Sequence, residues 1–195
     1  STANNRTTGN GCRFCAGKEA SVTNALAVLY PHVAAEWHPE KNGSLTPDQV
    51  VAKSGVKFWW KCDEGPDHEW EATVASRTAG GTGCGFCAGH KASVTNSLAV
   101  LNPELAAEWH PTKNGSLTPD QVVTGSQTKV WWKCDEGPDH EWEASVVNRT
   151  KGRGCRFCGS KGVSVTNSLA TLYPLVAAEW HPVKNGDMTP DQVTA

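Results

Sequence analysis

Two sets of cysteine and histidine residues have the clearest chemical potential in this sequence. In each set a C-x5-H pair is followed by a C-x-x-C pair, which begins 15 or 16 residues after the histidine. Three thiolates and one imidazole on two short pairs suit a tetrahedral zinc ion with a closed shell. We therefore predict two Zn²⁺ sites. Their ligands are Cys62, His68, Cys84 and Cys87 in the first site and Cys134, His140, Cys155 and Cys158 in the second.

Disulfide bonds are the main alternative for these cysteines. Eight cysteines and four N-x-S/T sequons are also compatible with a secreted, oxidised protein. Disulfides, however, give no reason for a histidine at a fixed place in W-K-C-x5-H-x-W, or for three cysteines per repeat. Zinc requires reduced thiols, so the zinc interpretation also predicts an intracellular, reducing compartment.

Which two pairs share a zinc ion is a separate question. Each C-x-x-C pair has a second option, the next C-x5-H along the chain, which would join Cys15 to Cys62 across 47 residues. Loop closure depends only weakly on length, so entropy leaves this register open. A hairpin that leads into a Gly-rich turn favours the short register, in which C-x5-H meets the C-x-x-C that follows it. Cys12 and Cys15 then form a partial metal site.

The ligand sets recur because the chain is an array of repeats. The motif S-V-T-N begins at residues 21, 93 and 164, so the period is 72 and then 71 residues. We predict complete zinc repeats at residues 21–92 and 93–163, the tail of a truncated repeat at 1–20 and the head of another at 164–195. The expected parent chain is longer, and neighbouring repeats are expected partners. No apolar run approaches the roughly 18 residues that a membrane span needs.

Each repeat is predicted to be a small α+β module of the zinc-ribbon-like or treble-clef-like kind. Asn102-Pro103 is typical of a helix start, and the helix is expected over Glu104–His110. Thr118-Pro119-Asp120 predicts a further short helical turn. The ranges Lys57–Cys62 and His68–Arg77 are rich in aromatic and β-branched residues, which favours a β-hairpin. The hairpin tip and a C-x-x-C knuckle would then face each other.

Several further motifs recur in this order: A-E-W-H-P, K-N-G, W-W-K-C, H-E-W, N-R and C-x-x-C. With these motifs, nearly the whole chain resembles the zinc-ribbon repeats of bacterial, algal and viral proteins. The resemblance implies a zinc-binding, treble-clef-like fold with ligands at the positions given above. Members of that family often accompany nuclease-like domains, so it also implies a link to nucleic acid. The chain departs from the family in a wider C-x5-H knuckle and in Ser76-Arg77, where Asn-Arg is usual.

The charge of the chain is small but unevenly distributed. The formal charge is −2. Each zinc site, with one Zn²⁺ ion, three thiolates and a neutral histidine, adds a net charge of −1, so two sites bring the charge of the chain to −4. That is the wrong sign for strong nonspecific phosphate binding. Residues 144–178 nevertheless contain five cations and no acid. The candidates for binding nucleic acid or another partner are Arg77, Lys91, Trp59, Trp131, Arg149, Lys151, Arg153 and Arg156.

Each of these residue types also has a structural interpretation. Strand alternation buries one tryptophan of each W-W pair and leaves the other to stack on bases or to pack within or between repeats. The W-H-P histidines are expected to cap carbonyls at helix ends once the zinc shell is full. Lys18, Lys91 and Lys161 are expected to be solvated surface charges.

The sequence thus predicts a non-enzymatic, tandem zinc-binding repeat module that binds a macromolecular partner. Nucleic acid is favoured as this partner by the family resemblance. The alternative, favoured by the net charge, is a structural scaffold or linker array that mediates protein–protein contacts in a larger assembly. A zinc hydrolase is disfavoured, because catalytic zinc keeps an open coordination position.

Overall fold

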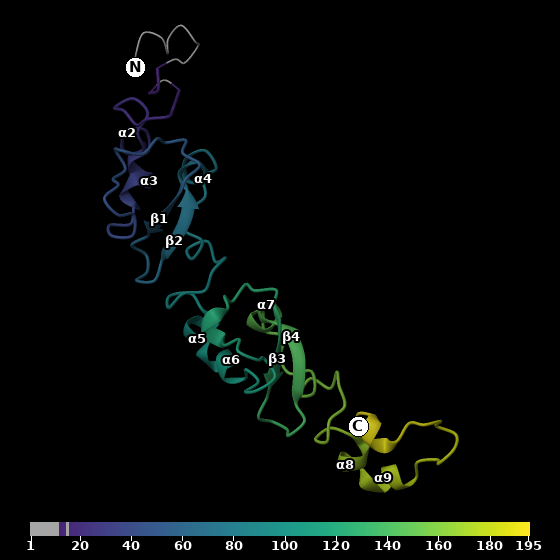
Figure 1. The fold of residues 1–195 in the computed structure, drawn as a ribbon. Coiled ribbons are helices and arrows are strands. Elements are labelled where there is room, and N and C mark those ends of the chain that lie inside the picture. The colour runs from purple at the N-terminus through teal and green to yellow at the C-terminus, as the bar shows by residue number, and fades with distance from the viewer. Residues whose placement is uncertain (1–11, 15) are drawn as a thin grey trace. The chain divides into compact units, whose positions relative to one another are not determined.

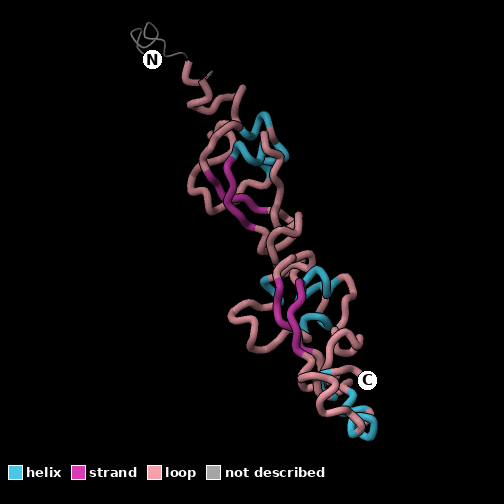
Figure 2. The backbone as a smooth tube through the Cα atoms, turned by 90° about the vertical axis from the view of Figure 1, so that its right-hand side faces the viewer, coloured by secondary structure: helices cyan, strands magenta, loops and turns pink. Residues whose placement is uncertain are grey.

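The computed structural model describes residues 12–14 and 16–195, and the chain divides into two compact units. The first unit ends at Val94 and the second begins at Thr95. Each unit combines a two-stranded hairpin with short helices (Figures 1 and 2), so the fold is small α+β, as predicted. Within the described part of the chain, no helix is long and apolar enough to cross a membrane.

Among the described residues of the first unit, two one-turn helices precede the hairpin. These are α2 (Leu26–Leu29) and α3 (Pro31–Ala35), and Pro31 stands at the first helical position, where its missing N–H costs nothing. Strand β1 (Lys57–Lys61) pairs antiparallel with β2 (Glu69–Thr73). Helix α4 (Val74–Thr78) follows β2 without a break. The hairpin therefore ends in a helix that leads the chain toward the C-x-x-C pair.

The second strand is shorter than the predicted range His68–Arg77, because α4 occupies its last part. Thr73 caps this helix: its side-chain oxygen accepts a hydrogen bond from the backbone N–H of Ser76 at 3.1 Å. The β-branched residues of this segment are typical of strands, so the sequence pattern favours a longer strand and does not indicate that Thr73 is a helix N-cap.

The second unit repeats this order and continues with the segment that the sequence predicts to be the head of a further repeat. Its first part contains α5 (Leu98–Leu101), α6 (Pro103–Ala107), the 3₁₀ helix η1 (Pro119–Gln121), β3 (Lys129–Lys133), β4 (Glu141–Ser145) and α7 (Val146–Thr150). The head contains α8 (Leu169–Leu172), α9 (Pro174–Ala178) and η2 (Pro190–Gln192). The same short elements thus recur at the same places in the repeat.

Helix α6 ends at Ala107, earlier than the predicted Glu104–His110, because the next residues join the hairpin. The backbone N–H of His110 donates to the backbone carbonyl of Trp131 at 3.0 Å. The backbone N–H of Lys133 donates to the backbone carbonyl of Glu108 at 2.7 Å. These bonds form a one-residue bridge beside β3. The predicted turn at Thr118 is confirmed, since η1 begins there with a capping box.

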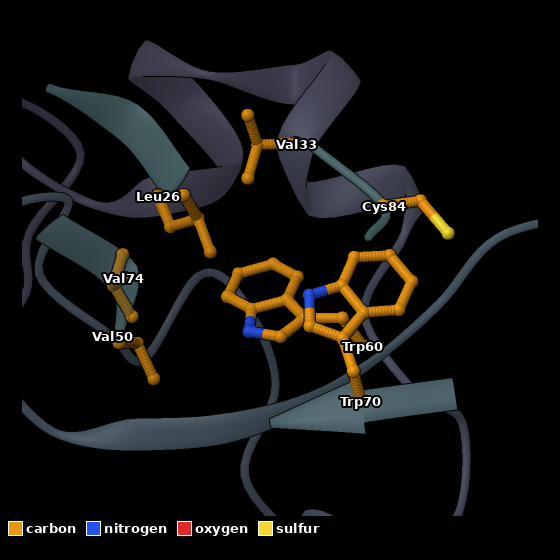
Figure 3. Close-up of a cluster of buried hydrophobic side chains, with 7 residues drawn as sticks. All are labelled: Leu26, Val33, Val50, Trp60, Trp70, Val74 and Cys84. Atoms are coloured by element: carbon orange, nitrogen blue, oxygen red, sulfur yellow. The ribbon is translucent and has the colours of Figure 1, made fainter. Parts of the chain in front are cut away.

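Paired tryptophans on adjacent strands form the centre of each core. In the first unit Trp60 is fully buried and lies opposite Trp70, and the cluster around them is drawn in Figure 3. The indole N–H of Trp60 donates to the carbonyl of Ala72 at 3.0 Å, so its burial leaves no donor unsatisfied. Trp132 and Trp142 have the same roles in the second unit. The prediction that one tryptophan of each W-W pair faces the core is confirmed.

Candidate metal centres

The hairpin and the knuckle bring the four predicted ligands of the first repeat together. Cys62 follows β1 and His68 precedes β2, and the N–H of Cys62 donates to the carbonyl of His68 at 3.0 Å. The Sγ atoms of Cys62 and Cys87 are 3.6 Å apart. Nδ1 of His68 lies 3.5 Å from Sγ of Cys87 and 3.8 Å from Sγ of Cys84. All four ligand atoms are within 4.8 Å of one another.

The second repeat builds the same cluster. Sγ of Cys134 is 3.6 Å from Sγ of Cys158. Nδ1 of His140 lies 3.5 Å from Sγ of Cys158 and 3.7 Å from Sγ of both Cys134 and Cys155. In both repeats, therefore, the C-x5-H pair meets the C-x-x-C pair that follows it, which is the short register.

These separations fit zinc and do not fit disulfide bonds. Tetrahedral zinc, with Zn–S bonds of about 2.3 Å and Zn–N bonds of about 2.05 Å, places two sulfurs about 3.8 Å apart and a sulfur and nitrogen about 3.6 Å apart. A disulfide needs about 2.05 Å. Desolvation, together with the thiols of Cys62 and Cys84, raises the pKa of Cys87 to about 12. Desolvation and the thiols of Cys134 and Cys155 raise the pKa of Cys158 to about 12 as well. Three sulfurs this close ionise together only around a cation, which zinc supplies.

Close packing fixes the orientation of each ligand histidine. Gly65 lies so near His68 that a Cβ atom there would be 2.6 Å from the ring. Phe86 stacks on the same imidazole, with ring centroids 5.0 Å apart and an interplanar angle of 10°. Gly137 and Phe157 pack on the second ligand histidine in the same way. The ring is thus held with Nδ1, rather than Nε2, toward the sulfurs.

The W-H-P histidines do not cap carbonyls as predicted. Nδ1 of His38 accepts hydrogen bonds from the backbone N–H groups of Glu40 and Lys41 at 3.2 and 3.1 Å. A ring nitrogen that accepts these bonds has no proton to give to a carbonyl. Nε2 of His38 lies 3.3 Å from a carboxylate oxygen of Glu69. His110 and His181 accept two backbone N–H groups in the same manner.

The carboxylate of Glu69 pairs with two lysines beside the first zinc cluster. Lys41 donates to its carboxylate at 2.5 Å, and Lys61 lies 3.4 Å away. The hydrogen bond from Lys41, aided by His38 and Lys61, lowers the pKa of Glu69 to about 2. In the second repeat Lys113 and the W-H-P histidine lower the pKa of Glu141 to about 2 in the same way. These clusters tie the W-H-P loop to the strand that begins beside the ligand histidine.

Two predicted partner-binding residues, Arg77 and Arg149, are buried. Nη1 of Arg149 donates to the carbonyl of Arg153 at 2.5 Å, and Nη2 pairs with Glu108. The Arg149 guanidinium also lies 5.2 and 5.1 Å from the ring centroids of Trp132 and Trp142. Arg77 makes the equivalent contacts in the first repeat. This placement removes both arginines from the residues that can contact a partner, contrary to the prediction.

The remaining aromatic and lysine candidates are only partly available. Trp59 and Trp131 are half-buried, and Lys41 and Lys113 each lie 4.4 Å from the centroid of one of these indoles. A base that stacks on this face must displace the lysine. Lys91 and Lys151 are both exposed, and Nζ of Lys91 lies 5.6 Å from the ring centroid of Phe86.

Arg153 and Arg156 line a cavity of about 1110 Å³ in the second repeat, together with two lysines that the sequence interpretation did not select. We term this cavity the knuckle groove, because β4 and the C-x-x-C loop form its walls. Its cations are Lys129, Arg153, Arg156 and Lys161, and its single acid is Glu143. Among the described residues, none of the four cations forms an ion pair. Lys161 was detectable as part of the acid-free stretch, whereas the place of Lys129 depends on the hairpin register.

The structure describes only one of the two cysteines of the predicted partial metal site. Cys12 is exposed, and Cys15 lies outside the described residues. The partial site therefore stays a prediction.

Two Cys₃His clusters on successive hairpins define this protein as a tandem, treble-clef-like, zinc-binding module. A family model for a "probable treble clef zinc finger domain" matches residues 33–90 and 105–161, which is more than half of the chain. The chain belongs to this family, in agreement with the resemblance seen in the sequence. Among curated proteins, none matches the chain.

Proposed function

We propose that this protein is a non-enzymatic zinc-finger module that binds nucleic acid through the knuckle groove of its second repeat. The observation that supports the proposal is the groove itself, in which four cations that form no ion pair with any described residue face one acid. Such a surface attracts phosphates and releases their counterions, although the chain as a whole is acidic. Zinc has a structural role, because four protein ligands complete its coordination shell.

The two repeats differ at this surface. Both buried arginines donate to a backbone carbonyl, that of Thr82 in the first repeat and that of Arg153 in the second, so these two positions correspond despite the one-residue gap. Three groove cations of the second repeat therefore have uncharged or weakly basic counterparts in the first. The pairs are Arg153 and Thr82, Arg156 and Gly85, and Lys161 and His90. We therefore assign the binding surface to the second repeat.

A protein partner is the second candidate, and the free edge of β4 favours it. The backbone N–H of Cys134 donates to the backbone carbonyl of His140, and the backbone N–H of Val146 donates to the backbone carbonyl of Thr128. Alternation along the antiparallel ladder then turns the backbone groups of Glu143 away from β3. This edge lines the knuckle groove. An extended acidic peptide has the groups to add there as a strand while its carboxylates meet the groove cations.

The test replaces three of the four groove cations of the second repeat by the corresponding residues of the first. We would compare the zinc-loaded full chain with its Arg153→Thr, Arg156→Gly and Lys161→His triple variant. Labelled single-stranded DNA, double-stranded DNA, RNA and an acidic peptide are titrated at about 50 and about 200 mM salt. We expect weaker nucleic-acid binding by the triple variant. For every phosphate that the variant no longer neutralises, the slope of log K against log salt should fall by about 0.7–0.9.

A matched control removes three exposed cations outside the groove, in the variant Lys53→Ala, Lys57→Ala and Lys184→Ala. It should bind nearly as well as the native chain. The reciprocal variant, Thr82→Arg, Gly85→Arg and His90→Lys, should add a second binding surface, and a Cβ at Gly85 meets only the Lys91 side chain at an ordinary 3.8 Å. If the native chain binds the acidic peptide but neither DNA nor RNA at low salt, the proposal fails and a protein partner replaces it.

A further inference from the structure

Each ligand histidine has a second ring nitrogen that faces away from the sulfurs. Because Nδ1 faces the sulfurs, Nε2 carries the ring proton when zinc is bound. Nε2 of His140 lies 3.1 Å from Oγ of Ser164 and 2.8 Å from Oγ1 of Thr166. Nε2 of His68 lies 3.2 Å from Oγ of Ser93. Both serines are buried, so their hydroxyl oxygens are placed to accept the Nε2–H bond without competition from bulk water.

These hydroxyls belong to the S-V-T-N motif, which by sequence begins the following repeat. The compact unit that contains the first zinc cluster nevertheless extends to Val94 and so includes the first two residues of the motif. The N–H of Val94 donates to the carboxylate of Asp67 at 2.9 Å, and that of Val165 donates to Asp139 at 2.8 Å. Each aspartate directly precedes a ligand histidine. The motif therefore contacts the preceding finger at the imidazole and beside it.

An asparagine fastens the motif to the C-x-x-C loop. Nδ2 of Asn167 donates to the carbonyls of Phe157 and Gly162, both at 2.9 Å. Its Oδ1 accepts the N–H of Ser164 at 2.8 Å. Phe157 lies between the two cysteines of the knuckle. One side chain thus connects the hydroxyl motif to the loop that carries two of the predicted zinc ligands.

The N-terminal copy of the motif shows that this arrangement forms without a histidine. Oγ of Ser21 lies 3.0 Å from Oγ1 of Thr23, and Oδ1 of Asn24 accepts the N–H of Ser21 at 2.7 Å. Asn24 also donates to the carbonyls of Phe14 and Glu19 at 2.8 and 3.1 Å. No histidine contact with this copy occurs in the part of the chain that the structure describes. The local turn therefore preorganises the hydroxyl pair, and the histidine meets acceptors already in place.

We infer that the S-V-T-N segment of each repeat positions the zinc histidine of the finger before it. Its hydroxyls accept the Nε2–H, which fixes the tautomer that ligates through Nδ1 and strengthens that nitrogen as a ligand. Loss of such a partner typically lowers metal affinity by about 10–100-fold. Zinc binding in one finger thus depends on the hydroxyls of the S-V-T-N segment that follows it. The inference does not depend on what the knuckle groove binds.

The test removes the acceptors from one site and leaves the other site as an internal control. In the full chain, Ser164→Ala with Thr166→Val deprives His140 of both hydroxyls and leaves His68 unchanged. Zinc occupancy is followed during chelator competition by cysteine alkylation and mass spectrometry, which distinguishes Cys155 and Cys158 from the cysteines of the first site. We expect the second site to lose affinity by about 10–100-fold while the first stays as in the native chain. Ser93→Ala should weaken only the first site.

A conservative variant separates the hydroxyls from the shape of the turn. Ser164→Thr with Thr166→Ser keeps both hydroxyls and should retain near-native zinc affinity. Equal zinc affinity in the native chain and in the variant without hydroxyls would overturn the inference. It would also be overturned if both double variants lost zinc, or lost the fold of the second unit, to the same extent. In that case the positions, and not the hydroxyl acceptors, would matter.

Discussion

Arg149 joins three parts of the second repeat through a single guanidinium group. It pairs with Glu108 just after α6, donates to the carbonyl of Arg153 in the loop after α7, and packs against the two core tryptophans. A planar group with five donors can make these contacts at once, whereas an ammonium group acts as a point charge. A cation that appears in the sequence to belong to a basic surface is therefore part of the core.

Substitution of this arginine should destabilise the repeat. We expect Arg149→Ala to lower the free energy of unfolding of the second unit by about 2 kcal/mol, because the half-buried Glu108 and the carbonyl of Arg153 lose their partner. Arg149→Lys should also destabilise it, since lysine lacks the planar fork. The measurement is denaturant unfolding of the zinc-loaded chain. Lys151→Ala, which removes an exposed charge two residues away, should change the free energy by less than about 0.5 kcal/mol. Equal effects of Arg149→Ala and Lys151→Ala would contradict the structural role.

At the scale of elements, the parts that could be predicted are those with a strong local signal. The hairpin follows from its aromatic and β-branched residues, and β1 ends one residue before the predicted limit at Cys62. The eight predicted ligands could be paired because residue type and spacing restrict zinc sites. Helices of four residues, such as α2, are too short for a hydrophobic period to show. The knuckle groove could not be predicted from local sequence patterns. It depends on the hairpin register that places Lys129 near the C-x-x-C loop, and the local sequence does not specify this register.

The start of α4 can be tested with a matched pair of caps. Thr73 and Ser145 occupy the same N-cap position in the two repeats, but only the Thr73 side chain accepts a hydrogen bond from the helix. We expect Thr73→Ala to destabilise the first unit by about 1 kcal/mol. Ser145→Ala should have a smaller effect on the second unit, because it removes no cap bond. Site-resolved hydrogen exchange of α4 and α7 measures both. A larger loss of protection in α7 than in α4 would contradict the cap assignment.

At the scale of the whole molecule, the chain is a series of small modules, each with its own core and zinc cluster. One core is built around Trp60 and Trp70, the other around Trp132 and Trp142. Cores of this size supply only a few kcal/mol, so metal binding should contribute much of the folding free energy. Removal of zinc by a strong chelator should therefore abolish the near-ultraviolet circular dichroism of the core tryptophans, and zinc should restore it.

The central claim is that each complete repeat holds its own structural zinc ion in a Cys₃His cluster. Native mass spectrometry of the purified chain and of two single variants tests it most directly. We predict two zinc ions bound to the native chain, one to Cys62→Ser and one to Cys134→Ser, because the clusters share no ligand. The claim would be contradicted by a native chain that holds a single zinc ion, by a variant that loses both, or by a zinc-free chain whose cysteines form disulfides.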